Sequence, residues 1–239
     1  MTIRVNIALP VLNEEVVLED AVRQVVDACA FSLPEEEVTV IISDNGSEDR
    51  TAEIGKRLAA EISGVRYLRV GETGKGIAIR GAWQSEEADV YVFMDIDLST
   101  DLGALPDLVR TARECGGMAI GSRFHRESKV TRSFVRRLVS FGYRWYLRAV
   151  LRTKVNDAPC GFKAATDEVV FNIMPFVRDE RWFFDTELVI RAERGGYEIR
   201  EMPIVWSERA VAGRESKVNV LKLSLEYARK VMDLKKRLK

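Results

Sequence analysis

Apolar runs alternate with amphipathic patterns through the first 121 residues of the chain. Short apolar runs bounded by turn-forming residues predict strands, whereas apolar residues that recur every three or four positions predict helices. The elements expected in chain order are strand 4–9, helix 14–29, strand 38–43, helix 50–62, strand 65–70, helix 76–84, strand 90–94, helix 102–115 and strand 118–121. This alternation indicates βαβ units, so we expect an α/β fold with a mainly parallel sheet.

The pattern after residue 121 is shorter and mixed. A basic segment occupies 129–154, and the chain ends in a charged amphipathic helix over 218–239. No internal repeat, low-complexity tract or linker divides the 239 residues. We therefore expect a single domain over 1–239.

Composition and charge exclude some classes of protein. With 37 basic and 37 acidic residues the net charge is zero, so no global field favours a nucleic-acid partner. Cys29, Cys115 and Cys160 form no CxxC pair, which argues against a metal-thiolate site and favours a reducing compartment. The chain has no signal-peptide pattern and no apolar run near the roughly 20 residues of a membrane span. We expect a cytoplasmic protein, or one peripheral on the cytoplasmic face of a membrane.

Two carboxylates, Asp95 and Asp97, directly follow the apolar run at 90–94. Open α/β folds bind ligands at the carboxyl ends of their strands. Because side chains at i and i+2 of an extended chain point the same way, the two carboxylates can share one divalent cation and leave positions open for phosphate oxygens. The plainer interpretation of so short a motif is an acidic loop, and the other strand ends have to decide between the two.

Polar residues follow the other predicted strands as well. Pro10 is expected to end the first strand, Asn13 to cap the next helix, and Glu14 to favour its first turn. Asp44, at the second strand end, is left to accept hydrogen bonds from a ligand such as a nucleobase. Gly74-Lys75-Gly76 offers backbone donors and a cation to an anion, but it lacks the Walker spacing and hydroxyl, which excludes a P-loop ATPase.

Taken in order, these motifs resemble the family 2 glycosyltransferases with the GT-A fold. The matching residues are Pro10, Asn13-Glu14, Asp44-Asn45-Gly46-Ser47, Gly74-Lys75-Gly76, Asp95-Ile96-Asp97-Leu98, Gly121-Ser122-Arg123, 157–163, Phe184-Asp185-Thr186-Glu187 and 209–217. Together they are similar to the dolichyl-phosphate mannose synthase branch, which moves a sugar from a nucleotide onto a polyprenyl phosphate. Two positions depart from the usual pattern: Asn45 replaces an Asp, and Ser99 replaces a Gln that commonly follows the metal pair.

The resemblance implies a GT-A (Rossmann-like) fold, a central mostly parallel sheet flanked by helices, with a nucleotide-binding half at 1–100 and an acceptor-binding half at 101–217. It implies Mg²⁺ or Mn²⁺ held by Asp95 and Asp97, with Ser99 at a third coordination position. It further implies a set of residues that bind the nucleotide sugar, which are Pro10, Glu14, Asp44, Lys75, Ile96, Arg209 and Lys217. Arg209 and Lys217 belong to a loop expected to close over the phosphates and exclude water.

The resemblance also implies inversion at the anomeric carbon by a single displacement. Asp185 and Glu187 are the candidates for a catalytic base or for holding sugar hydroxyls, and their plainer role is support at a helix start. A phosphate acceptor is already anionic near neutral pH and needs no strong base, whereas a hydroxyl acceptor does.

The segment 129–154 bears on the acceptor. It holds eight Lys or Arg and no Asp or Glu, and helical spacing places an apolar stripe on it, formed by Phe134, Leu138, Phe141 and Trp145. A basic helix with such a face is typical of an element lying on anionic lipid, and the alternative is that the stripe packs on the sheet. Arg136 and Ser140, one turn apart, are expected with Arg123 to bind the acceptor's phosphate.

The C-terminal helix repeats the amphipathic pattern. One face is expected to carry Leu221, Leu225, Ala228 and Met232, and the helix ends in Lys-Lys-Arg. It is either a second membrane contact or a docking helix for a membrane protein or a second copy of the chain.

Three interpretations compete. The preferred one is a peripheral-membrane enzyme that transfers mannose or glucose from a GDP- or UDP-linked donor to a polyprenyl phosphate. The second is a soluble family 2 enzyme with a hydroxyl acceptor, and the third is a non-catalytic module that binds a nucleotide sugar or lipid. The acidic pair at 95–97 argues against the third, because a binding module has no need of two carboxylates at one rim.

Overall fold

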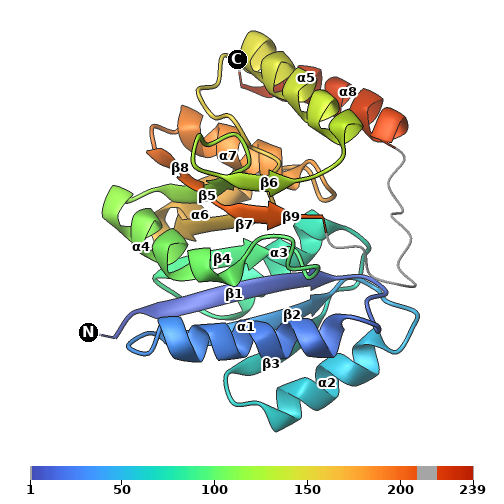
Figure 1. Ribbon diagram of the computed structural model, residues 1–239, viewed down its shortest axis with the longest axis vertical. Coiled ribbons are helices and arrows are strands. Elements are labelled where there is room, and N and C mark those ends of the chain that lie inside the picture. Colours follow the sequence, from blue (N-terminus) through green and yellow to red (C-terminus); the bar gives the residue numbers. More distant parts are fainter. Residues whose placement is uncertain (1, 209–219, 239) are drawn as a thin grey trace.

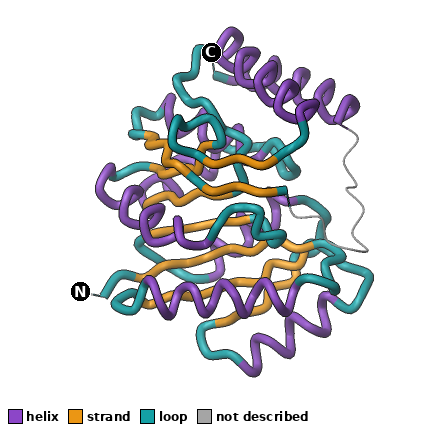
Figure 2. The backbone as a smooth tube through the Cα atoms, in the orientation of Figure 1, coloured by secondary structure: helices purple, strands orange, loops and turns teal. Residues whose placement is uncertain are grey.

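The protein folds as three layers, with helices on both faces of a central sheet (Figure 1). The structure is a computed structural model, and it describes residues 2–208 and 220–238. Within these residues one sheet has seven strands and a second has two, and Figure 2 shows the strands stacked between the helical layers. The expected α/β fold with a mostly parallel sheet is confirmed.

The large sheet combines both halves of the chain. Its strands, in the order in which they lie, are β3 (Val65–Arg69), β2 (Glu37–Asp44), β1 (Arg4–Val11), β4 (Val90–Met94), β7 (Phe162–Thr166), β5 (Met118–Ser122) and β8 (Ile199–Pro203). The pairs from β3 to β4 are parallel, and β7 is antiparallel to both of its neighbours. The small sheet pairs β6 (Lys129–Thr131) with β9 (Val205–Ser207). Because β7 lies between β4 and β5, it brings residues around 160 next to the end of β4.

β1, β4, β5, β7 and the second half of β2 are buried on both faces, which is why these stretches are largely apolar in sequence. Alternate residues of each strand point to opposite sides, so Ile7 and Leu9 join one core while Ala8 joins the other. The first core is covered by α1 (Leu18–Ser32), α2 (Thr51–Glu61) and α4 (Leu105–Cys115), and the second by α3 (Lys75–Ser85), α5 (Phe134–Leu151), α6 (Asp167–Ile173), α7 (Phe184–Arg194) and α8 (Val220–Arg237). Short 3₁₀ turns lie at Leu102–Ala104 and Met174–Phe176.

The predicted elements of the first 121 residues are all present, with differences at their ends. β1 continues through Pro10 to Val11, so the proline does not end the strand. α1 begins only at Leu18, because Asn13 has a positive φ of 55° and its side chain accepts a hydrogen bond from Glu48 instead of capping the helix. α4 begins at Leu105, since the preceding residues 102–104 form a 3₁₀ turn.

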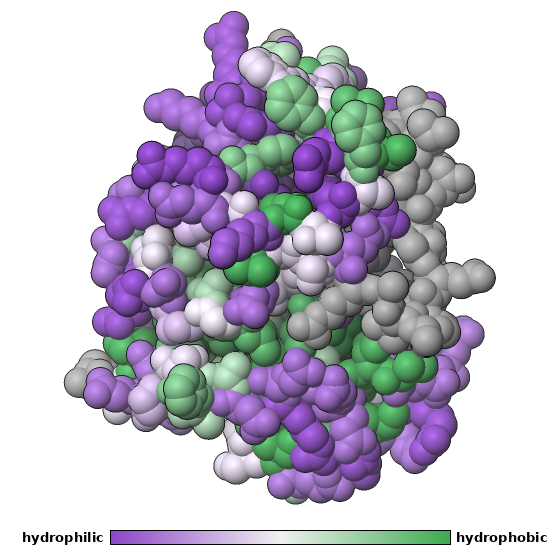
Figure 3. All heavy atoms as spheres, viewed as in Figure 1, coloured by the Kyte–Doolittle hydropathy of each residue, from purple (hydrophilic) through white to green (hydrophobic). Residues whose placement is uncertain are grey.

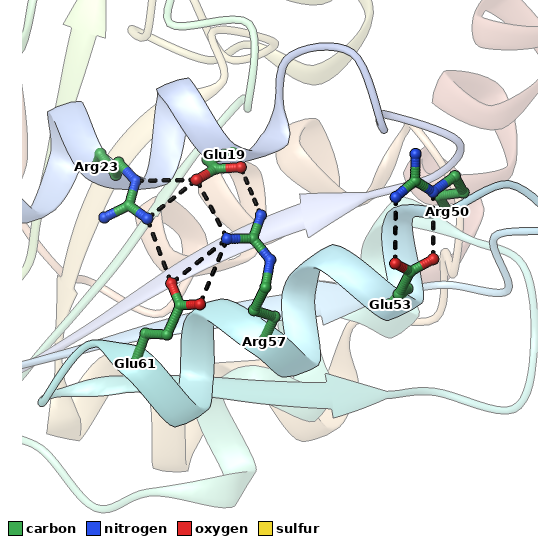
Figure 4. Close-up of polar contacts among 6 residues, drawn as sticks. All are labelled: Glu19, Arg23, Arg50, Glu53, Arg57 and Glu61. Carbon is green, nitrogen blue, oxygen red and sulfur yellow. Dashed lines mark hydrogen bonds and ion pairs between the residues drawn. The ribbon is translucent and has the colours of Figure 1, made fainter.

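Ion pairs link the solvent faces of α1 and α2 (Figure 4). Glu19 accepts hydrogen bonds from Arg57 and Arg23, which lower the pKa of this carboxyl to about 2. The network lies in solvent, where single pairs contribute little to stability, so the packing of these helices rests on their buried apolar faces.

Helices α5 and α8 lie side by side on one end of the molecule (Figure 1). On α5, Leu147 and Leu151 face the protein core, whereas the expected stripe of Phe134, Leu138, Phe141 and Trp145 is 47–77% exposed. Figure 3 shows hydrophobic side chains gathered over this end. The stripe therefore does not pack on the sheet.

The buried face of α8 differs from the expected one. Val231 and Leu234 are buried, while Met232 is 43% exposed. The side chains of Leu221 and Leu225 lie outside the described residues. None of the helices in the described part of the chain is both long and apolar enough to cross a membrane.

Candidate active site

The carboxyl ends of β1, β2 and β4 form one edge of the sheet, and the loops that follow them meet there. Backbone and side-chain groups join the first two loops: Asn13 N donates to Ser47 Oγ at 2.9 Å, and Glu48 N donates to Asn13 Oδ1 at 2.8 Å. Glu14 N donates to the hydroxyl of Thr51 at 2.8 Å. These contacts hold the loops as one wall of a site, with Pro10 buried at its base and Glu14 half-buried at its rim.

Asp44 is fully buried in this wall and already has protein partners. Its Oδ1 accepts from Ser47 N at 2.8 Å, and its Oδ2 accepts from Tyr67 Oη at 2.7 Å and from Arg69 at 3.4 Å. Burial, followed by the contact with Asp44, raises the pKa of the Tyr67 hydroxyl to about 12. Because a carboxylate accepts about four hydrogen bonds, one place remains for a ligand. The contact of Asp44 with a nucleobase stays a prediction.

The acidic pair lies on a turn rather than on an extended strand. Leu98 has a positive φ of 48°, and its N–H donates to Asp95 O at 3.2 Å, so the chain reverses directly after β4. The side chains of Asp95, Asp97 and Ser99 nevertheless line one small cavity, and Ser99 N donates to Asp97 Oδ1 at 3.0 Å. Ile96 points away into the core, so only its backbone can contact a ligand at this edge.

The strand β7 places Gly161 directly against Asp95. Asp95 N donates to Gly161 O at 3.1 Å, and a Cβ at Gly161 would lie only 1.9 Å from Asp95 Oδ2. A side chain here would displace the carboxylate, which explains the glycine in the motif at 157–163. Within the described residues no group of three or more His, Cys, Asp or Glu side chains is placed to hold a metal. A cation on Asp95 and Asp97 would therefore complete its coordination with Ser99, water or phosphate oxygens.

Lys75 joins the acidic pair to Asp185, a residue 110 positions away in the sequence. Its Nζ lies 2.7 Å from Asp95 Oδ1 and 2.8 Å from Asp185 Oδ2, and the side chain is only 7% exposed. The ammonium also lies over the rings of Phe93 and Trp182, at 5.3 Å and 5.5 Å from the centroids. Burial disfavours the charge on Lys75, but the attraction of Asp185 and Asp95 outweighs it and raises the pKa of this lysine. The ammonium stays charged between the two carboxylates.

Three further charges extend this cluster inward. Lys163 is fully buried, its Nζ lies 5.2 Å from the centroid of the Phe93 ring, and it donates to Cys160 O. Burial lowers the pKa of Lys163, and Asp185 opposes this effect. Asp157 is also fully buried and forms a two-pronged pair with Arg123, whose Nε and Nη2 lie 2.8 Å and 2.6 Å from the carboxylate oxygens.

Glu187 is not brought to this cluster. Residues i and i+2 of a helix do not share a face, so Asp185 and Glu187 point apart. The carboxylate of Glu187 is fully buried and accepts from Arg237 at 2.6 Å, from Arg191 at 2.8 Å and from Asp179 N at 3.0 Å. These contacts favour a structural role for Glu187, whereas Asp185 lies beside the acidic pair.

The expected acceptor residues lie around Arg132, a residue that the sequence did not single out. Ser140 Oγ accepts from Arg132 at 3.0 Å, and the charges of Arg123 and Arg136 act on this guanidinium from nearby. Arg136 itself pairs with Glu208. Arg132 also stacks on Trp206 at 5.3 Å, and Trp206 lines the cavity that holds Asp95 and Asp97. Arg132 is thus closer to the acidic pair than its place in the sequence indicated.

Sequence reasoning missed four residues of the site: Arg132, Asp157, Lys163 and Trp206. Asp157 and Lys163 lie in a motif that the sequence singled out. Which residues they contact depends on β7, whose position in the sheet no local pattern reveals. Arg132 stood among eight cations with nothing to separate it from the others. Arg209 and Lys217, expected to bind the donor's phosphates, lie outside the described residues.

Comparisons with known proteins agree with this arrangement. The family model described as "Glycosyl transferase family 2" matches residues 6–172. Glycosyltransferase AglD of Haloferax volcanii is 34% identical over 209 residues, which is 87% of this chain and 34% of that protein. The dolichyl-phosphate beta-glucosyltransferases of Drosophila melanogaster and Dictyostelium discoideum are 30% and 26% identical, cover 87% and 98% of this chain, and are themselves covered over 68% and 74%. The chain thus spans about a third of AglD.

Solved structures share the fold over nearly the whole chain. Glucosyl-3-phosphoglycerate synthase from Mycobacterium tuberculosis in complex with UDP has a TM-score of 0.68 at 22% identity, covering 99% of this chain and 80% of that one. The same enzyme with Mn²⁺, UDP and phosphoglyceric acid has a TM-score of 0.67 at 21% identity, covering 97% and 77%.

The pair of Asp157 and Arg123 makes a prediction about stability. Replacing Asp157 with Ala leaves the largely buried Arg123 without its carboxylate, and we expect the free energy of unfolding to fall by about 3–5 kcal/mol. The control is Asp107→Ala, which removes an exposed ion pair with Arg110 and should cost no more than about 1 kcal/mol. Urea denaturation measures both. Equal effects of the two substitutions would contradict the role given to the buried pair.

Proposed function

The chain belongs to glycosyl transferase family 2, and from that premise we propose that it is an inverting glycosyltransferase which moves a hexose from a nucleotide sugar to a polyprenyl phosphate at a membrane surface. The observation that carries this proposal is the cluster of Asp95, Asp97, Lys75 and Asp185 at the carboxyl ends of the strands. Relatives named as dolichyl-phosphate beta-glucosyltransferases support the choice of acceptor, and glucose over mannose.

The first half of the chain is assigned to the donor. Pro10, Glu14 and Asp44 form the wall that would contact the base and ribose, and the diphosphate would lie over the cavity of Asp95 and Asp97. Mg²⁺ or Mn²⁺ held by these two carboxylates would offset the charge that develops on the departing nucleoside diphosphate. The two carboxylates and the neighbouring hydroxyl of Ser99 are oxygen ligands of the kind such cations prefer, so the residues present fit the group.

The residues of the chain orient the reacting groups. Lys75 holds Oδ1 of Asp95, and this contact would fix the orientation of the carboxylate in the cavity that it shares with Asp97. Asp185 is held by the same ammonium, and its Oδ1 has no hydrogen-bond partner among the described residues. That buried oxygen lacks a hydrogen bond, which a hydroxyl of the bound sugar would supply by donating to it, and the contact would fix the hexose for in-line attack.

The acceptor half would hold the phosphate through Arg132. This guanidinium is half-buried, donates to Ser140, and has no carboxylate within ion-pair distance among residues 2–208 and 220–238. Burial and then the neighbouring Arg123 lower its pKa, so an incoming anion would relieve an existing cost. Arg123 and Arg136 already have acidic partners, which makes them supporting residues for the same subsite.

The exposed stripe of α5 supports attachment to a membrane. Its aromatic and aliphatic side chains face solvent beside basic residues, the combination that binds at the boundary of headgroups and acyl chains. A polyprenyl phosphate presents its phosphate at that depth, so a peripheral enzyme on the cytoplasmic face can reach it without a membrane span.

The acidic pair of Asp95 and Asp97 gives the first functional prediction. Asp97→Asn should keep the fold and lower turnover by about 100-fold or more. The cation that would stabilise the leaving nucleoside diphosphate loses one of its two carboxylate ligands. Asp101→Asn is the matched control, since asparagine keeps the cap that Asp101 forms with Gly103 N. Transfer assays with Mg²⁺, Mn²⁺ and chelator measure the effect. Full activity of Asp97→Asn, or of the parent in chelator, would refute the assignment.

The binding of the acceptor gives the second functional prediction. We expect Arg132→Ala to raise the KM for polyprenyl phosphate by about 10-fold or more while nucleotide-sugar affinity stays constant, because a charge-assisted contact to phosphate is lost. Arg137→Ala, which removes an exposed cation from α5 just after Arg132, is the control. Asp185→Asn should retain appreciable turnover, since a phosphate acceptor is already ionised.

The reverse pattern would support the alternative function, a soluble enzyme with a hydroxyl acceptor. The free Oδ1 of Asp185 is the observation that favours it, because a base is then required and its loss costs about 10²–10⁴ in rate. Unchanged acceptor saturation in Arg132→Ala together with an inactive Asp185→Asn would therefore replace the lipid-phosphate proposal.

The third prediction concerns the membrane. The triple variant Phe134→Ser, Leu138→Ser, Trp145→Ser should lose most binding to anionic liposomes, and binding of the parent should weaken as salt rises, because surface potential decays over about 10 Å at 0.1 M. Phe31→Ser, which removes an exposed aromatic from α1, is the control. If sedimentation with liposomes is the same for parent and triple variant, α5 is not the contact.

A further inference from the structure

The segment 178–187 forms one side of the pocket that holds the Lys75 ammonium. It supplies the Asp185 carboxylate and the Trp182 ring, both in contact with that ammonium. Its backbone also supports the turn that carries Lys75: Ile77 N donates to Glu180 O at 3.2 Å, and a Cβ at Gly74 would lie 2.2 Å from the same oxygen. The place of Lys75 therefore depends on the place of this segment.

Helix α8 holds the same segment from the other side. Arg237 lies 2.6 Å from Glu187, and Lys230 lies 2.6 Å from Asp179. Between these two ion pairs, Tyr227 Oη donates to the Trp182 carbonyl at 2.9 Å. The three contacts come from helix positions between 227 and 237, and they hold the segment at its start, middle and end.

These contacts are costly to lose because their acidic partners are buried. Glu187 is fully buried; burial alone would raise its pKa, but hydrogen bonds from Arg237 and Arg191 outweigh this and lower it. Asp179 is only 10% exposed in its side chain. Without Arg237 or Lys230, each carboxylate would draw in water or a new partner, and the backbone that carries it would shift.

We propose that Arg237, Lys230 and Glu187 are positioning residues, through which α8 sets the geometry of Lys75 and Asp185. The inference rests on the proposed glycosyl transfer for its kinetic test and on the fold alone for its structural one. A shift of about 1 Å in a group that orients the reactants is enough to lower turnover by about 100-fold. The contacts proposed for the donor's base and ribose lie in the loops after β1 and β2, outside the segment 178–187, so most of the donor's contacts are kept. We call the three contacts of Arg237, Lys230 and Tyr227 with the segment 178–187 the clamp. Loss of the clamp should lower kcat and leave the donor KM nearly unchanged.

The experiment compares Arg237→Gln with Arg237→Lys and with Lys236→Ala in the whole chain. Lys236 is the matched control, since it is a neighbouring cation of the same helix end with a side chain 77% exposed. Hydrogen exchange of the amides at 178–190 and 74–78 is measured first, at a temperature where thermal unfolding shows every variant folded. We expect the amides of both stretches to exchange faster in Arg237→Gln than in the parent, and at the parental rate in Lys236→Ala.

Kinetics then follow under the same conditions. We expect kcat of Arg237→Gln to fall by about 10-fold or more with a donor KM within about 2-fold of the parent, and Arg237→Lys to recover part of kcat because it keeps the charge. Lys230→Ala, whose ion pair is less buried, provides a second variant if Arg237→Gln does not fold.

The outcomes separate the two proposals. A parent that transfers no hexose to polyprenyl phosphate refutes the proposed function, and the exchange data still decide on the clamp. Unchanged exchange at 74–78 in Arg237→Gln and Lys230→Ala overturns the clamp, as does a parental kcat in an active enzyme. A fall in activity that Lys236→Ala reproduces, or that only follows the unfolded fraction, also overturns it.

Discussion

The buried ammonium of Lys75 is the interaction on which the rest of the site depends. A charge removed from water is costly unless it is paired, and here two carboxylates from different parts of the chain, Asp95 and Asp185, supply the pairing. The constraint spreads outward. The glycines at 74 and 76 are required because the turn presses on the backbone at 179–180, and Gly161 is required because β7 passes against Asp95. Removing Lys75 would take from the buried Asp185 its ion-pair partner, and removing Asp95 or Asp185 would leave the ammonium with a single carboxylate, so the three charges fix one another's positions.

Much of this could be predicted from the sequence, because the relevant signals are local. The three strands that carry the motifs, β1, β2 and β4, are largely apolar, and their order with the helices implies parallel pairing. Parallel strands end at a common edge, which is enough to bring the motifs at 10–14, 44–47 and 95–97 together. The predicted start of the first helix was wrong, because another hydrogen bond competes with the helix cap. Asn13 is a good helix cap in isolation, but the neighbouring loop offers Glu48 N, and the helix begins at Leu18 instead.

The remainder of the site could not be predicted, because it depends on contacts across long stretches of sequence. Nothing in the sequence around Lys75 indicates its contact with Asp185. Nothing around Asp95 indicates its contact with Gly161 either, because β7 lies antiparallel between β4 and β5, and the βαβ pattern predicts only parallel neighbours. The surroundings of Glu187 could not be predicted for the same reason. Its spacing from Asp185 suggests a pair of active carboxylates, but helical geometry turns it towards Arg191 and Arg237, the latter from the last turn of α8.

The basic character of α5 illustrates how far a count of charges can mislead. Of the eight cations at 129–154, Arg136 pairs with Glu208, Arg148 donates to Asn156, and Arg144 lies over Phe124, so these charges are partly spent on the protein itself. Lys129, Arg137, Arg152 and Lys154 remain exposed. At about 1 kcal/mol for each cation near an anionic surface, electrostatics alone would give weak attachment. The exposed aromatic stripe would have to supply the remainder, through apolar area removed from water. Attachment of this kind would be shallow, which would suit the proposed enzyme, whose acceptor would present a phosphate at the headgroup level while its donor arrived from water.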